Sequence, residues 1–248
     1  MPPSRAQEDI EPLTQRVGEL QRYLIDLKGY IVIENALSES EIGNLNLIID
    51  DQLLPPPTTY NRFGTAPLGS GFLGWHSSFI PLVDHESVIN ILQFLLGPFF
   101  SLGSIYGIYE DRFVGEPLGK ELRAHANEGT ETSLTCSVIW NITDAGPGIG
   151  GFCCIDGSHH VRGSFPSSMY DTCHRSDLVV TPYAPAGSAV VITASLLRGD
   201  SSWLGPHQRR SLVFEYTTAK DTDPKRRIAL PTYELTRRQE AILGYSDV

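Results

Sequence analysis

Apolar residues in the first part of the chain recur with the spacing of amphipathic helices. Six of them lie three or four positions apart and are expected to face a core: Ile10, Leu13, Val17, Leu20, Leu24 and Leu27. A second helix is expected to begin at Ser38, because Ser38 and Glu41 have the S-x-x-E spacing of a capping box. This helix should end at the prolines 55–57 and bury the apolar positions Ile42, Leu45, Ile48 or Ile49, and Leu53.

The pattern then predicts a loop, one more helix and a series of strands. Residues 54–86 are rich in Pro, Gly, Thr and Ser and are expected to form a long loop. Residues 85–98 return to helical spacing and end in Gly97-Pro98. Short β-branched or alternating runs predict strands at 99–109, 134–142, 151–155, 178–183, 188–194 and 210–217, after an early strand in YIVIEN and before a last short helix in YELTRRQEAIL. Helices followed by antiparallel strands indicate an α-plus-β layout.

The length and composition fit one globular domain that binds neither nucleic acid nor a membrane. The chain has 248 residues, of which 41% are hydrophobic and 19% are charged. A net charge of −10 argues against a nucleic-acid backbone as partner. Neither a signal peptide nor a run of about 18 apolar residues is visible, so we expect a cytoplasmic protein. The four cysteines, which are widely spaced except for one adjacent pair, are expected to be reduced.

Four segments carry a more specific pattern: GYIVIENALSESEI, GWHSSFIPLVDHESVINILQFLLGP, VIWNITDAGPGIGGFCCIDGSHH and LLRGDSSWLGPHQRRSLVFEYT. Together, over about residues 28–245, they resemble the phytanoyl-CoA dioxygenase family of Fe(II)/2-oxoglutarate oxygenases. The resemblance implies a mainly β fold with α-helices, a double-stranded β-helix (a cupin-like jelly roll) with N-terminal helices packed on one sheet. It divides a single domain, residues 1–248, into an N-terminal helix in 1–27, the loop at 54–86, a jelly-roll core at 99–217 and a C-terminal extension at 218–248.

The family's chemistry requires Fe(II) held by two histidines and one carboxylate, with three open positions for 2-oxoglutarate and oxygen. An H-x-D or H-x-E pair supplies the first histidine and the acid, and an LxHG turn supplies the second histidine. A later arginine binds the far carboxylate of 2-oxoglutarate through its planar guanidinium. The resemblance makes His125 the first metal ligand and Arg209 the 2-oxoglutarate arginine.

The chain departs from this pattern at the other two ligands. Asn127 stands where the carboxylate is expected, and Arg198 stands in place of the second histidine. A guanidinium does not deprotonate in proteins and repels a divalent ion. We therefore predict that His125 is a vestigial ligand and that this chain alone binds neither Fe(II) nor 2-oxoglutarate. Substitute ligands stay open as an alternative, since five candidates lie near the expected pocket in sequence: Glu128, Glu131, Cys136, Asp200 and His207.

Three hypotheses of function follow. In the first, the chain is not catalytic on its own and supports an active paralogous oxygenase as a heterodimer, in natural-product biosynthesis on a small lipophilic substrate. In the second, it is an active non-heme iron dioxygenase or isomerase that uses His125 and unusual ligands. In the third, it is a binding module in which Arg198 and Arg209 attract a carboxylate ligand.

Overall fold

The structure, a computed structural model, describes residues 17–56, 61–66, 69–114, 122–123, 134–162, 165–167, 177–218 and 228–245. At its centre is a six-stranded antiparallel sheet in the order β1-β6-β4-β8-β3-β2. These strands are β1 (Tyr30–Ile33), β2 (Asn61–Ala66), β3 (Ser101–Glu110), β4 (Thr135–Asn141), β6 (Ala189–Thr193) and β8 (Arg209–Thr217). A second sheet pairs β5 (Gly151–Cys154) with β7 (Arg198–Ser201), also antiparallel.

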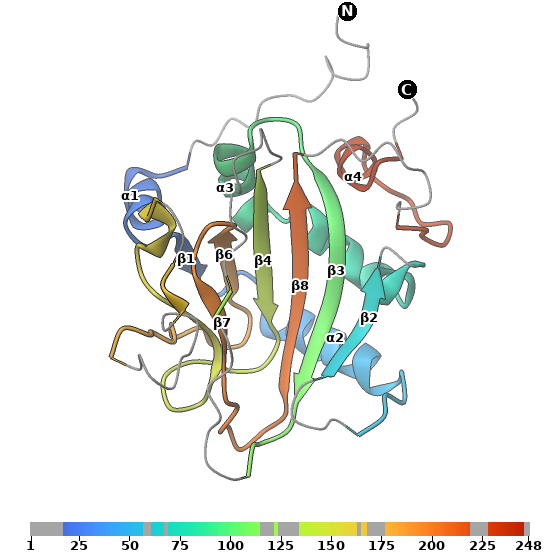
Figure 1. Cartoon of the computed structure of the whole chain (residues 1–248). Coiled ribbons are helices and arrows are strands. Elements are labelled where there is room, and N and C mark those ends of the chain that lie inside the picture. Colours follow the sequence, from blue (N-terminus) through green and yellow to red (C-terminus); the bar gives the residue numbers. More distant parts are fainter. Residues whose placement is uncertain are drawn as a thin grey trace, which may run out of the picture.

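The helices form a layer on one face of the large sheet. The α-helices are α1 (Glu19–Lys28), α2 (Glu39–Asp50), α3 (Glu86–Leu96) and α4 (Arg237–Leu243), and the 3₁₀ helices are η2 (Gly71–Gly74), η3 (Ser77–Val83) and η4 (Ser158–His160). Figure 1 shows α2 and α3 behind the large sheet and β7 in front of it. Within the described ranges, no single helix is long and apolar enough to cross a membrane, and one bent pair, η3 with α3, reaches that length and composition.

The two faces of the large sheet bury different sets of side chains. On β4 and β8, Trp140, Phe214 and Tyr216 are buried against the helices. Ile139 and Val213 belong to a second apolar cluster, on the side of the small sheet. Successive side chains of a strand point to opposite faces, so each central strand contributes to both clusters. The expected mainly β architecture, with helices packed on one sheet, is confirmed.

The second and third helices begin where the sequence predicts them. The capping box of α2 is present: the Glu41 backbone N–H donates to Ser38 Oγ at 3.3 Å, and the Ser38 N–H donates to Glu41 Oε2 at 2.8 Å. The expected C-terminus of α2 is wrong, because the helix ends at Asp50 and Leu53 is 90% exposed. Leu53 has a φ of 50°, and the residue before Pro55 is disfavoured in helical conformation, so the chain leaves the helix a turn early.

Residues 54–86 are not the continuous loop that their composition predicts. The described part contains β2, η2 and η3, and β2 pairs with the edge of β3. Phe63 and Ala66 of β2 are buried. Six residues with a central Gly64 have too little alternation of apolar and polar side chains to indicate a strand. The segment forms a strand because its backbone pairs with β3.

Two further expectations about strands need correction. Residues 178–183 form no named strand, and Val180 makes a single β-bridge with Cys154. In contrast, β7 was not expected, because its sequence RGDS carries no apolar side chain. This strand forms because each of its four residues has a backbone partner on β5.

Only part of the apolar stripe predicted for the first helix faces the core, since Val17 is buried there, just before α1 begins. Ile25 is buried in α1, whereas Leu20 is 69% exposed and Leu27 is 50% exposed. Gly29 follows α1 at once, with a φ of 83°, and its N–H donates to the Ile25 carbonyl before β1 begins. This tight turn joins α1 directly to β1, and in the resulting packing Leu20 and Leu27 of the stripe remain exposed.

Replacing Gly29 by alanine should destabilise the fold. A Cβ at this position would lie 2.6 Å from His159 Nδ1 and 2.8 Å from Leu196 Cδ1, and the positive φ adds strain. We expect Gly29→Ala to lower the free energy of unfolding by about 1–3 kcal/mol in urea denaturation. The matched control is Gly43→Ala inside α2, where a Cβ meets no atom within 4 Å and should stabilise by about 0.5–1 kcal/mol. Equal destabilisation by both variants would contradict this account.

Candidate functional site

The face of the large sheet opposite the helices lines a cavity of about 610 Å³. One apolar residue from each of four strands forms part of its wall: Ile108 on β3, Ile139 on β4, Ile192 on β6 and Val213 on β8. Phe152 on β5 lines it from the small sheet. The alternation that sends the neighbouring residues toward the helices brings these side chains together. The cavity thus lies between the two sheets, with an apolar wall from both.

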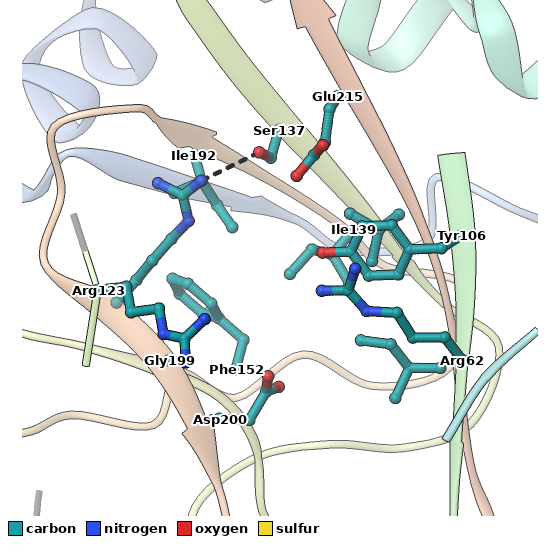
Figure 2. A pocket seen from close by; sticks show the side chains of 13 residues that line it. Arg62, Tyr106, Arg123, Ser137, Ile139, Phe152, Ile192, Gly199, Asp200 and Glu215 are labelled. Carbon is teal, nitrogen blue, oxygen red and sulfur yellow. Dashed lines mark hydrogen bonds between the residues drawn. The ribbon is translucent and has the colours of Figure 1, made fainter. Parts of the chain in front are cut away.

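Arg198 lies in this cavity at the start of β7. Its Nη1 donates to the carbonyls of Thr193 at 3.2 Å and Ala194 at 3.0 Å. Its Nη2 donates to Ser137 Oγ at 3.3 Å, the dashed line at Ser137 in Figure 2. Burial lowers the pKa of this guanidinium below its ordinary value, and the charge of Glu215 opposes the shift. An arginine stays protonated in proteins, so the place expected for the second histidine holds a fixed cation.

Two other arginines line the cavity, and the sequence did not single them out. The guanidinium carbon of Arg62, on β2, lies 3.8 Å from the centre of the Tyr106 ring, a cation–π contact. Arg123 exchanges backbone hydrogen bonds with Arg198, at 2.7 and 2.9 Å. Figure 2 shows Arg62 and Arg123 on opposite sides of the cavity. No local signal could have found them, because Arg62 lies in a segment that looked like a loop and Arg123 lies outside every expected strand.

Arg209, the residue expected to bind 2-oxoglutarate, is only 1% exposed and is not part of the cavity lining. Its guanidinium forms salt bridges with Glu110 at 3.2 Å and Asp200 at 2.5 Å. Two carboxylates thus already neutralise it. Asp200, one of the candidate substitute ligands, is bonded to Arg209. The role of Arg209 toward 2-oxoglutarate stays a prediction.

The described residues do not fit an iron centre of the expected kind. Within these ranges, no group of three or more His, Cys, Asp or Glu side chains could hold a metal ion. His125 and Asn127 lie outside the described residues, as do the candidate ligands Glu128 and Glu131, so the prediction for them is not tested. The position of Arg198 carries hydrogen-bond donors rather than a ligand lone pair.

The remaining candidate ligands have other surroundings. Cys136 is buried on the helix side of β4, and burial raises the pKa of its thiol to about 12. His207 precedes β8, where its Nε2 lies 3.2 Å from the Asp144 carbonyl oxygen. His159, in the GSHH turn, has its Nε2 3.0 Å from the Asp26 carbonyl oxygen and so links η4 to α1. None of the three lines the cavity.

No family model matches this sequence, and neither does any curated protein. Solved structures do resemble it. HygX from Streptomyces hygroscopicus, solved with nickel and 2-oxoglutarate bound, has a TM-score of 0.62 and 15% identity over 81% of this chain and 87% of its own. SnoK, a non-heme α-ketoglutarate-dependent carbocyclase from nogalamycin biosynthesis, has a TM-score of 0.57 and 15% identity over 81% of this chain and 84% of its own.

A third relative by structure is the epimerase SnoN, solved with Fe³⁺, α-ketoglutarate and nogalamycin RO. Its TM-score is 0.59, with 12% identity over 86% of this chain and 94% of its own. Identities this low establish the fold and not the activity. The chain has the mainly β, cupin-like fold of 2-oxoglutarate-dependent oxygenases, built as two antiparallel sheets with helices on one face.

Proposed function

We propose that this chain is an oxygenase-fold protein without an iron centre of its own, and that it supports an active paralogous oxygenase in natural-product biosynthesis. The observation that carries this proposal is the guanidinium of Arg198, held by three hydrogen bonds at the expected place of the second histidine. The biosynthetic setting is taken from the structural relatives, of which SnoK acts in nogalamycin biosynthesis.

The arginine disfavours a bound metal ion for two reasons, its positive charge and its lack of a lone pair that could bind the metal. A guanidinium about 4 Å from a divalent ion, at an effective dielectric of about 20, is repelled by about 8 kcal/mol. It also lacks the lone pair of a neutral imidazole. Moving the side chain away would break its bonds to the Thr193 and Ala194 carbonyls and to Ser137. Leaving such groups unpaired costs free energy, so the arginine is stabilised where it lies.

Support for a partner comes from α1. Leu20, Tyr23 and Leu27 are 69%, 62% and 50% exposed, although the first and last belong to the stripe whose spacing predicts burial. A paralogous oxygenase that packed against this side of α1 would bury these three exposed side chains. Scattered single apolar residues need no explanation, whereas three on one helix form a contiguous apolar strip.

Purified without a metal-chelating tag and reconstituted anaerobically with Fe(II), the protein should hold far less than one iron per chain. Iron is measured by plasma emission spectroscopy after removal of free metal. The double variant Asn127→Asp, Arg198→His is the matched control, because it restores the two missing ligand types and should bind more iron. Near-stoichiometric iron in the natural chain, lost on His125→Ala, would overturn the proposal.

Co-expression with a paralogous oxygenase that carries an intact H-x-D pair should raise the solubility and turnover of that oxygenase. Replacing Leu20 and Leu27 by serine should weaken the complex in size-exclusion chromatography, because the apolar area that it buries is lost. Leu53→Ser is the control, since Leu53 is 90% exposed and lies away from α1, at the end of α2. A paralogue that is equally soluble and active alone would rule out the supporting role.

A further inference from the structure

Among the described residues, the side chains that line the cavity between the two sheets include more cationic than anionic groups. Three guanidinium groups line it, those of Arg62, Arg123 and Arg198, together with the two carboxylates of Asp200 and Glu215. Each carboxylate has a protein partner, since Asp200 is bonded to Arg209 and Glu215 accepts a hydrogen bond from Ser104. The nearby buried pair of Arg209 and Glu110 contributes one positive and one negative charge, so it does not change this difference among the described residues. The lining therefore favours an anion.

Arg198 is the group best placed to bind one. Its three hydrogen bonds all go to neutral oxygens, two backbone carbonyls and the Ser137 hydroxyl. A guanidinium has five N–H donors, so within the described part of the chain its Nε and one Nη2 hydrogen have donor capacity left. A guanidinium that keeps donors free can bind a carboxylate through charge-assisted hydrogen bonds. Arg123 is held beside it by the backbone bonds between the two residues.

The apolar residues of the lining indicate what kind of molecule could carry the negative group. Ile139, Phe152 and Ile192 offer an apolar surface in the same cavity, and its volume of about 610 Å³ is typical of sites for small organic molecules. The remaining donors of the one guanidinium of Arg198 suit one carboxylate. The aromatic and branched side chains suit a hydrocarbon or aromatic body.

We propose that this cavity binds an organic monocarboxylate with an apolar body, in the absence of a metal ion, with the carboxylate on Arg198. The inference goes beyond the supporting role proposed above, because it concerns a ligand of this chain itself. Iron content tests the first proposal, and carboxylate binding by the metal-free chain tests the second, so either can fail alone.

The test is isothermal titration calorimetry on the metal-free full chain with three monocarboxylates: 3-phenylpropionate, indole-3-acetate and octanoate. Each is paired with its neutral amide, and 2-oxoglutarate is titrated with and without Fe(II). We expect at least one monocarboxylate to bind about tenfold or more tightly than its amide, because hydrogen bonds to charged groups are the stronger ones. Metal-free 2-oxoglutarate should bind more weakly, since it has two charges and no apolar body.

Arg198→Gln should weaken binding of that carboxylate about tenfold or more, with Arg198→Lys in between, because lysine keeps the charge and loses the fork. The matched control is Arg210→Gln. Arg210 is the next residue to Arg209 on β8, donates to Asp50 at 2.6 Å and does not line the cavity, so its loss should leave binding unchanged. If Arg198→Gln does not fold, Arg123→Gln serves in its place.

Three results would overturn the proposal. The first is that none of the three monocarboxylates binds to the folded, metal-free chain. The second is that the amides bind as well as the acids, or that the arginine variants bind as well as the natural chain. The third is that tight binding is seen for 2-oxoglutarate alone and requires Fe(II), which would assign the cavity to the family's cofactors.

Discussion

The fold depends on the antiparallel pairing of the two central strands, β4 and β8. In this register Ile139 lies opposite Val213 and Trp140 lies opposite Leu212. The first pair faces the cavity, and the second is buried under the helices. A slip of one residue would turn Trp140 into the cavity and Ile139 toward the helices, because side chains alternate along a strand. The helix layer and the cavity thus depend on the same register.

Two arginines, Arg209 in the large sheet and Arg198 in the small sheet, have contrasting surroundings. Arg209 pairs with Glu110, which lies opposite it in the β3–β8 register, and with Asp200. Arg198 contacts neutral oxygens, although the charge of Glu215 stabilises its protonated form. A buried cation bonded to two carboxylates is largely neutralised, whereas Arg198 donates to carbonyls and a hydroxyl and is offset by Glu215 through its charge alone. The family pattern assigns ligand binding to the first arginine, and the structure turns the second toward the cavity.

Local sequence patterns predict elements well where the periodicity is long or a cap is present. The capping box of Ser38 with Glu41 and the apolar periodicity of α3 are two such cases. The patterns fail at β2 and β7, which have few apolar residues and form through pairing with β3 and β5. They also fail in part for the first helix, where Val17 and Ile25 meet the core but Leu20 and Leu27 of the stripe are exposed. Each failure comes from a contact between distant segments, which local propensity does not encode.

The sequence by itself determined the helix-then-strand order, the expected cupin-like fold and the presence of Arg198 where a histidine is expected. The element order follows from spacing along the chain, and the fold and the place of Arg198 follow from the resemblance to the oxygenase family. Only the tertiary structure decided that Arg62, Arg123 and Arg198 line one cavity, and that Arg209 lies between two carboxylates. The physical reason is that these side chains belong to segments far apart in sequence. Strand pairing and the packing of the two sheets bring them together. The charged side chains therefore act on one another, and on a ligand, only in the folded protein.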